Sequence, residues 1–509
     1  LAGLGNRWNG RLPNVKNLSP ETAAVLAGFK VENKVANKVV RLELDAANLS
    51  DEALAEVSLF PGILLLRGLT ADTLSDGKLA ALAGFNGAAL GLGGVAALPP
   101  ELAEQIATTF ATKFLFLDDV TELSPEAARA LVEFSGQVSL NGLTEVSPEL
   151  VRALGDLTKR SLKGVTSLSP EAAAAVVEGF RGASLKLNLT SLPAETAKEL
   201  ARGTRNDLVL DRLTELSDEA AAALGECNVT NLWLRGLTDL SPGAAKGLAS
   251  IKGRTLGPTL RLDSLRSLSP AAAEALAASD ITYLELTGLE TLSAETARAL
   301  ARSKAFTGSL PGLTKLSADA AAALATFAGK KSGGGKLNLF GLATLSPEAA
   351  RGLAAFQGEL ELDGLTEIDA ETAAALATSA GPKLSLKGLK TLSAETAEQL
   401  AKAKAWNGDL ASLRSLSDEA AEALAGFEGQ GLAIFVPLSD RAVRALAGFR
   451  GSSLYLRVSR PSGEAVRALA GFRGDSLSLA GLQEPTDELT RLLPEFACKK
   501  LSLHPWEWN

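Results

Sequence analysis

The sequence predicts an α/β solenoid of about twenty strand–turn–helix units stacked along one axis. Two observations lead to this prediction. A Leu-Ser step recurs at nearly constant intervals, and each interval pairs an alternating Leu-x-Leu segment with an alanine-rich one. The recurring slot is filled by Ser19, Ser50, Ser75, Pro99, Ser124, Ser147, Ser169, Pro193, Ser217, Ser241, Ser269, Ser293, Ser317, Ser346, Asp369, Ser393, Ser417, Ser439, Ser462 and Thr486.

The unit from Tyr283 to Ala301 shows the elements in order. Leu284–Leu286 alternates apolar and polar side chains, which is typical of a short strand with one buried face. Thr287–Gly288 then turns the chain, and we expect glycine there because it tolerates a positive φ. Leu289 and Leu292 are expected to point back into the core. Such a unit buries too little apolar area to fold alone and is stabilised by stacking on its neighbours.

Ser293 is expected to begin the helix of this unit as its N-cap, because its hydroxyl can accept a hydrogen bond from a free backbone N–H. Glu295 places a negative charge at the positive end of the helix dipole. Other units carry proline directly after the cap, where its missing N–H has no cost. These prolines include Pro125, Pro148, Pro170 and Pro347.

The helical segment is about ten residues long in this prediction, as in Pro125–Phe134. Ala127, Leu131 and Phe134 share one face of such a helix, which we expect to be buried, while its charged residues face water. Glycines then follow, and they are expected to end the helices as left-handed C-caps. Gly136, Gly451 and Gly474 are examples.

Composition and charge exclude several classes of protein. The net charge is −8, with both signs interspersed and no basic run, which argues against a nucleic-acid partner. No apolar stretch reaches the roughly 18 residues of a membrane-spanning helix. Hydrophobic residues make up 46% of the chain but aromatic residues only 5%, so the core is expected to consist of leucine and alanine in thin layers.

The sequence gives no support for catalysis, and we expect no enzyme activity, metal or cofactor. His504 is the single histidine, which excludes Ser–His triads and multi-histidine metal sites from the body of the chain. Carboxylates recur at the starts of the predicted helices, as dipole partners would. The stretch Gly329–Lys336 superficially suggests a phosphate loop, but a predicted strand follows it instead of a helix.

The two cysteines, Cys227 and Cys498, lie about eleven units apart, which is on the order of 50 Å at ~4.8 Å per strand. A disulfide needs Cα atoms within about 7 Å, so the two cannot pair within one solenoid. We expect buried free thiols, with a bridge between subunits as the alternative.

These units resemble the leucine-rich repeat, and in particular its cysteine-containing subtype. Leu284, Leu286, Leu289, Leu292 and Ser293 occupy the slots of the consensus L-x-L-x-x-C-x-x-I-T-D. The slot that this family fills with Cys or Asn holds an apolar residue here, so the family's buried side-chain hydrogen-bond ladder is expected to be absent. The resemblance implies a curved, right-handed solenoid with a parallel sheet on the concave face, helices on the convex face and a role in binding or scaffolding. The apolar slot residues include Leu143, Val165, Leu237 and Leu365.

The predicted organisation is an N-terminal cap over residues 1–17, one solenoid over 18–500 and a C-terminal strand or tail over 501–509. The chain begins at Leu1 and contains no methionine, as it would after removal of a secretion signal, although an artificial start of the chain explains this equally well. We therefore expect an extracellular or cell-surface location, with a cytoplasmic one as the alternative. The richness in Ala, Gly, Leu and Arg suggests a bacterial source.

Candidate contact residues lie on the expected concave face and near the ends of the chain. Trp233, with Arg235 and Arg261, is the best candidate for a contact spot, because Trp and Arg dominate interface energetics. Phe340 and Tyr455 are further candidates, although an ordinary solvated sheet face remains the alternative. Trp8, Trp506 and Trp508 are expected either to cap the ends or to join one subunit to the next.

Three hypotheses about function follow. The first is a non-catalytic structural or adhesive subunit of a bacterial surface assembly, such as a fibre or coat, which self-associates. The second is a recognition module that binds a protein, peptide or glycan on its concave face. An intracellular adaptor ranks third, because no second recruiting domain is visible in the sequence.

Overall fold

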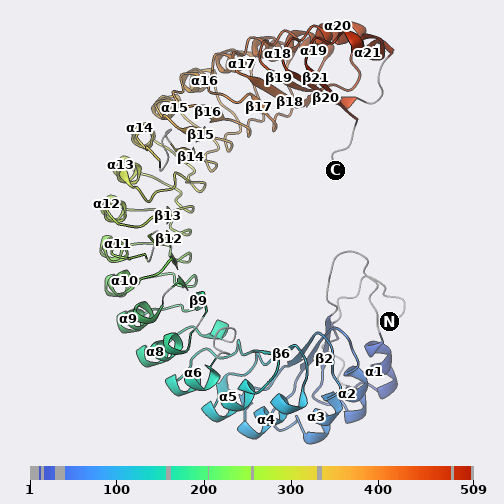
Figure 1. The fold of residues 1–509 in the computed structure, drawn as a ribbon, viewed down its shortest axis with the longest axis vertical. Coiled ribbons are helices and arrows are strands. Elements are labelled where there is room, and N and C mark those ends of the chain that lie inside the picture. The colour runs from blue at the N-terminus through green and yellow to red at the C-terminus, as the bar shows by residue number, and fades with distance from the viewer. Residues whose placement is uncertain are drawn as a thin grey trace. The chain divides into compact units, whose positions relative to one another are not determined.

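The computed structural model describes residues 11–12, 17–28, 41–155, 162–180, 182–204, 206–253, 257–329, 335–482 and 487–505 (Figure 1). The chain divides into two compact units: residues 1–234 with 251–254, and residues 235–250 with 255–509. Within each unit, helices cover one side of parallel strands. The predicted α/β fold of repeated strand–turn–helix layers is confirmed.

The first unit begins with β1 and ends with β11. Its parallel strands follow the orders β1-β2-β3-β4-β6-β8 and β9-β10-β11, with a small β5-β7 pair. Its elements are β1 (Arg11–Leu12), α1 (Pro20–Ala27), β2 (Arg41–Asp45), α2 (Asp51–Val57), β3 (Ile63–Arg67), α3 (Asp76–Leu82), β4 (Ala89–Leu92), β5 (Ala97–Leu98), α4 (Pro100–Thr109), β6 (Phe114–Phe116), β7 (Glu122–Leu123), α5 (Pro125–Val132), β8 (Gln137–Ser139), α6 (Pro148–Leu154), η3 (Leu162–Gly164), α8 (Pro170–Gly179), β9 (Ser184–Lys186), α9 (Ala194–Gly203), β10 (Asp207–Val209), α10 (Asp218–Gly225) and β11 (Asn231–Trp233).

The second unit pairs β12 with β13, then β14 with β15 and β16, and then β17 through β21 in chain order. Its elements are α11 (Pro242–Leu248), β12 (Thr259–Arg261), α12 (Pro270–Ala277), β13 (Tyr283–Glu285), α13 (Ala294–Arg302), α14 (Ala318–Leu324), β14 (Lys336–Asn338), α15 (Pro347–Ala354), β15 (Glu359–Glu361), α16 (Ala370–Ala377), β16 (Lys383–Ser385), α17 (Ala394–Ala401), β17 (Asp409–Leu410), α18 (Asp418–Ala425), β18 (Gly431–Pro437), α19 (Asp440–Leu446), β19 (Ser453–Arg457), α20 (Gly463–Ala470), β20 (Ser476–Leu482), α21 (Asp487–Leu492), η4 (Leu493–Glu495) and β21 (Lys500–Pro505).

Strand register follows the repeat, because equivalent leucines lie opposite one another. Leu208 pairs with Leu185 on one side and Leu232 on the other, and all three are buried. The predicted helix stripe is confirmed as well, since Ala127 and Leu131 are fully buried. Each layer therefore adds its leucines and alanines to a core that continues through the unit.

The predicted N-caps are confirmed. The Ser293 hydroxyl accepts a hydrogen bond from the Thr296 N–H at 3.1 Å, and Ser417 accepts one from Ala420 at the same distance. Pro99 occupies the same slot before α4 but has no side chain that can accept such a bond. The recurring serine therefore marks where each helix starts because it satisfies a backbone donor there.

Glycine was predicted to end the helices as a left-handed C-cap and to allow a positive φ in the turn after each strand. Both predicted roles are wrong at the positions named here and in the next paragraph. Gly136 and Gly451 do not cap helices: the C-cap of α5 is Glu133 and that of α19 is Ala447, both in right-handed conformation. A Cβ on Gly451 would instead lie 2.2 Å from the Phe449 ring. This glycine is needed because the phenylalanine two residues earlier folds back over it.

The turn glycine Gly288 does not have a positive φ. A Cβ added there would lie 2.1 Å from the carbonyl oxygen of Asp263, in the turn of the preceding layer. Gly364 and Gly388 are crowded in the same way, with carbonyl oxygens at 1.8 Å and 1.9 Å from the added Cβ. Glycine is needed in these turns because adjacent turns stack closely.

The slot that resembles the Cys or Asn position of the leucine-rich repeat is apolar and buried, as predicted: Leu143 is 1% exposed and Val165 0%. Direct backbone hydrogen bonds join the turns of successive layers at the residue that follows this apolar slot. Thr166 N–H donates to the Thr144 carbonyl, and Thr190 N–H donates to Thr166, both at 2.9 Å. Backbone pairing thus connects the turns where the family uses side chains.

Among the helices that the structure describes, four carry a buried threonine in their first turn, a feature that the sequence analysis missed. The Thr296 hydroxyl donates to the Leu268 carbonyl of the preceding layer at 3.0 Å. Thr196 makes the equivalent bond to Leu168, also at 3.0 Å. The other two are Thr372 and Thr396. These bonds connect each such helix to the layer before it.

Replacing Thr296 by valine is expected to destabilise α13 by about 1–2 kcal/mol, because the Leu268 carbonyl loses its donor while the volume stays almost the same. Hydrogen exchange of the α13 amides would measure the loss as faster exchange. Thr238→Val, at an exposed position, is the matched control and should leave exchange unchanged. Equal protection in both variants would show that the hydroxyl contributes nothing.

Candidate interaction surfaces

The predicted contact spot is divided between the two units. Trp233 ends β11 in the first unit, whereas Arg235 and Arg261 belong to the second. All three side chains are half-buried. Arg261 is also held by its own strand end, since its Nη2 lies 3.0 Å from Asp263 Oδ2. The contact spot that combines these residues stays a prediction.

Phe340 and Tyr455 lie on different sheets of the second unit and are not brought together. Phe340 follows β14 and is 43% exposed. Tyr455 lies on β19 and is half-buried. Its ring centroid lies 4.7 Å from that of Phe435, a residue of the adjacent strand β18 that is 38% exposed. The second unit therefore presents an aromatic pair on its sheet face, defined here as Phe435 and Tyr455.

The aromatic pair lies next to an irregularity in the register of β18. Ala433 lies opposite Tyr455 in the strand register, and the pairing then shifts between Ile434 and Pro437. Phe435 belongs to the shifted segment, so its ring reaches Tyr455 diagonally. The sequence did contain one signal: Leu432, Ile434 and Val436 alternate with the exposed positions, which places Phe435 on the open face.

The remaining predicted residues are described in part. Trp8, Trp506 and Trp508 lie outside the described residues, as do residues 330–334 of the glycine- and lysine-rich loop. Lys336, which follows that loop, begins β14 and pairs with Glu361 at 2.7 Å.

Both cysteines are free thiols. Burial raises the pKa of the Cys227 thiol to about 12, so this thiol is unreactive at neutral pH. The prediction of a buried thiol is confirmed for Cys227 and wrong for Cys498, which is half-buried.

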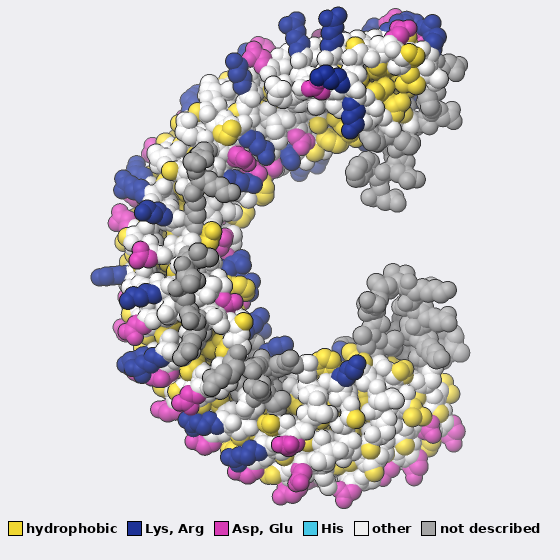
Figure 2. Space-filling view, viewed as in Figure 1, with side chains coloured by type: hydrophobic (Ala, Val, Ile, Leu, Met, Phe, Trp, Pro, Cys, Tyr) yellow, Lys and Arg dark blue, Asp and Glu magenta, His cyan; other side chains and the backbone are white. Residues whose placement is uncertain are grey.

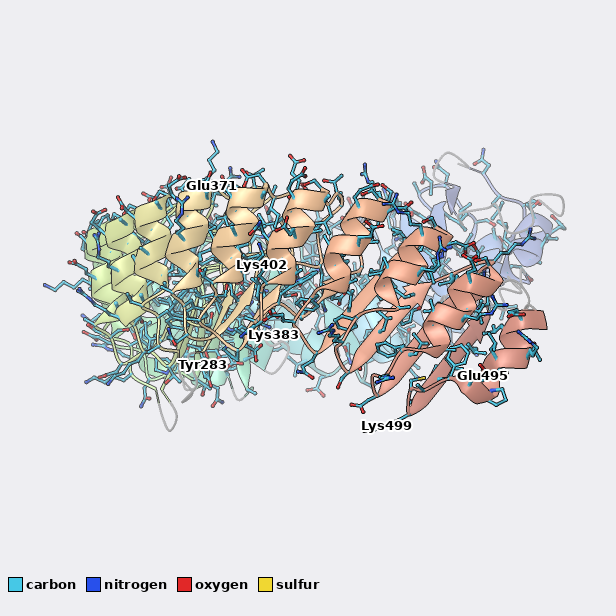
Figure 3. All side chains as sticks on the ribbon, turned by 90° about the horizontal axis from the view of Figure 1, so that it is seen from above. Tyr283, Glu371, Lys383, Lys402, Glu495 and Lys499 are labelled. Atoms are coloured by element: carbon cyan, nitrogen blue, oxygen red, sulfur yellow. The ribbon has the colours of Figure 1, made fainter. Side chains whose placement is uncertain are left out.

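The helix starts of the second unit lie along one rim and the strand starts along the other. In Figure 3, Glu371 lies at the rim of helix starts, and Tyr283 and Lys383 lie at the opposite rim. Figure 2 shows acidic and basic side chains interspersed along the helical side of each unit. Exposed ion pairs between neighbouring helices, such as Arg444 with Glu464 at 2.5 Å, each contribute at most about 1 kcal/mol.

Glutamates at the helix starts make stability depend on pH. A hydrogen bond from its own backbone N–H, and then the cap hydroxyl of Ser293, lower the pKa of the Glu295 carboxyl. Backbone N–H groups lower the pKa of Glu348 and Glu395 in the same way. A carboxyl with a lowered folded pKa stabilises the fold above its unfolded pKa, about 4.3 for Glu, and loses this contribution as the pH falls through the folded value.

The urea midpoint of the protein is therefore expected to fall as the pH drops from 6 to 3. A triple variant, Glu295→Gln with Glu348→Gln and Glu395→Gln, should show a flatter dependence, because three of the titrating groups are gone. Urea unfolding followed by circular dichroism across this range would measure both. Parallel curves for the two proteins would show that these carboxylates do not set the acid sensitivity.

The described residues contain no group of three or more His, Cys, Asp and Glu side chains that could hold a metal ion. None of the helices in the described part of the chain combines the length and apolar character needed to cross a membrane.

No protein-family model matches the chain, and no curated protein matches it. Among solved structures, it is similar to the TLR13–ssRNA13 complex, at 14% identity and a TM-score of 0.37, over 96% of this chain and 68% of that one. It is also similar to the Toll–Spatzle complex of Drosophila (14%, TM-score 0.33, 97% of this chain and 55% of that one) and to the Rad7–Elc1 complex of yeast (13%, TM-score 0.26, 54% and 80%). These likenesses are too distant to assign a family, and the description of the fold rests on the chain's own strand pairing and helix packing.

Proposed function

We propose that this chain is a non-catalytic interaction module that binds a protein partner through the open faces of its sheets. The observation that carries the proposal is the exposed aromatic pair. Aromatic side chains bury a large area with few rotatable bonds and are enriched among the residues that dominate interface energetics. Phe435 and Tyr455 lie on paired strands, so they are already ordered before a partner arrives.

The test is capture of partners from the source cells with the immobilised full chain. Replacing both Phe435 and Tyr455 by alanine should lower the amount of captured partner at least tenfold, since truncating a central aromatic anchor typically costs about 2 kcal/mol. Leu493→Ala is the control, because it removes an exposed apolar side chain of the same unit that lies outside the strands. Unchanged capture by the double variant would contradict the proposal.

A narrower form of this proposal is a self-associating subunit of a bacterial extracellular or cell-surface assembly. It is supported by the tryptophans near both ends of the sequence, Trp8, Trp506 and Trp508. Sedimentation and negative-stain microscopy at high concentration should then show end-to-end assemblies that the triple Trp→Ser variant lacks. Monomers at all concentrations would contradict this form and leave the broader proposal standing.

A further inference from the structure

A hollow of about 390 Å³ lies on the sheet face of the first unit that its helices do not cover. Two glycines contribute to it, Gly91 in β4 and Gly93 directly after β4. Gly91 lies between Leu65 of β3 and Phe116 of β6 in the strand register. A Cβ on Gly91 would lie 2.5 Å from Leu65 Cδ2 and 3.6 Å from Phe116 Cβ. Leu65 and Phe116, with Ile63, thus form the apolar walls of the hollow.

One end of the hollow is cationic. Arg41 and Arg67 line it, and both contact the buried carboxylate of Glu43, with Arg41 Nη2 at 3.1 Å and Arg67 Nε at 2.6 Å. The Glu43 side chain is 3% exposed, whereas the arginine side chains are 42% and 59% exposed. Glu43 and Asp45, which is opposite Arg67 in the strand register, lie beside the arginines but outside the lining, so the guanidinium groups are the charged groups that line this end of the hollow.

The other end is anionic. Asp119 Oδ2 accepts a hydrogen bond from the Gly94 N–H at 2.7 Å, and Asp118 Oδ1 accepts one from the Asn141 N–H at 3.1 Å. Both carboxylates line the hollow and are exposed. Among the residues that the structure describes, neither forms an ion pair with lysine or arginine.

Gly93 separates the two ends. A Cβ on Gly93 would lie 3.3 Å from Asp119 Oδ2 and 3.5 Å from Arg67 Cγ. Strands β3 and β6 are two strand spacings apart, or about 10 Å, which an extended peptide covers in about three residues. The hollow therefore places positive and negative side chains on either side of Gly93, with the apolar space around Gly91 beside them, within the length of a short peptide segment.

We propose that this hollow binds an extended peptide segment of a partner protein with a matching order of side chains. An acidic side chain lies against Arg41 and Arg67, an apolar one fills the space above Gly91, and a basic one lies against Asp118 and Asp119. In the sequence of the bound peptide, the acidic and basic residues are then two or three positions apart. This inference rests on the proposed function, since it names the partner chemistry of one sheet face.

The test is selection of displayed random heptapeptides on the immobilised full chain. We expect enriched sequences to carry an acidic and a basic residue two or three positions apart, with an apolar residue between. Gly91→Leu places a side chain in the hollow, and its Cβ is crowded only by the flexible end of Leu65, so it should lower the retention of these peptides at least tenfold. Asp119→Asn keeps an acceptor for the Gly94 N–H and is a milder second variant. It should remove the preference for the basic residue and keep that for the acidic one.

Several results would overturn the proposal: no enriched sequences, enriched sequences without the charge pattern, or equal retention by the Gly91→Leu variant. The double variant Phe435→Ala with Tyr455→Ala is the control, because it alters the other unit and should retain the selected peptides. Peptides lost from that variant but retained by Gly91→Leu would overturn the assignment of the hollow while supporting the aromatic pair. The proposed function would fail separately, if capture of partners from the source cells were unaffected by the aromatic pair.

Discussion

Replacing Phe449 by alanine is expected to destabilise the second unit by about 3–5 kcal/mol. Phe449 is 3% exposed and lies between Phe427 and Phe472, with ring centroids at 6.0 Å and 6.5 Å. The three rings stack almost parallel through successive layers, so alanine leaves a cavity that neither neighbour can fill. Long repeat arrays do not unfold in a single step, so the loss of stability should be measured in the layers around Phe449 and not as one global free energy of unfolding.

Hydrogen exchange of the α19 and α20 amides measures this loss. A local destabilisation of that size should accelerate their exchange by two to three orders of magnitude or more, at about 1.4 kcal/mol per tenfold. Phe340→Ala is the control, since that ring is exposed and its removal leaves no internal cavity. Unchanged protection in the Phe449 variant would contradict the description of the ring stack as a structural core.

Replacing Gly364 by alanine is expected to disrupt the stacking of two turns and to cost about 1–3 kcal/mol or more. The added Cβ would lie 1.8 Å from the carbonyl oxygen of Phe340 and 2.6 Å from its carbonyl carbon. Both are backbone atoms, which cannot rotate out of the way as a side chain could. Relief therefore requires the two turns to separate, which weakens the pairing of β14 with β15.

Gly431→Ala is the matched control for this variant. It also adds one methyl group to a glycine of the second unit, but its nearest neighbour would be the Ser453 carbonyl oxygen at 3.7 Å, an ordinary contact. Its effect should lie within about 1 kcal/mol of zero, since alanine also restricts the unfolded chain. Thermal unfolding and exchange of the β14 and β15 amides would compare the two, and equal losses would refute the crowding argument.

The period and the helix starts could be predicted from sequence because both depend on residues within one unit. Leu284 and Leu286 alternate with polar residues, as a strand with one buried face requires. Ser293 bonds to the N–H of Thr296, three residues away, so its role is local. Such short-range requirements recur in every unit, so they can be recognised in the sequence.

Features that depend on the distance between layers could not be predicted in the same way. The sequence suggested a positive φ at Gly288. Glycine is needed there because a Cβ would collide with a carbonyl oxygen of the preceding turn. Thr296 occupies a slot that other helices fill with alanine, and only the position of Leu268 shows that its hydroxyl is bonded. A weak signal exists, because each buried threonine follows an Ala-Glu pair, as in 294–296.

The candidate surfaces were predicted less well than the fold. Tyr455 was identified without Phe435, because Phe435 lies in the part of β18 where the register shifts, a feature that the repeat does not encode. The hollow was missed entirely. Gly91 opens a space only because Leu65 and Phe116 lie on either side of it.

The direct backbone bonds between turns also determine where this architecture accepts extra length. An insertion within a turn would break the bond to the next turn, as between Thr144 and Thr166. Natural length variation avoids that region: the three longest units have their additional residues between a helix and the next strand, within 28–40, 249–258 and 325–335. A grafted loop or an affinity tag should therefore be placed between helix end and strand start, where each layer already tolerates a variable number of residues.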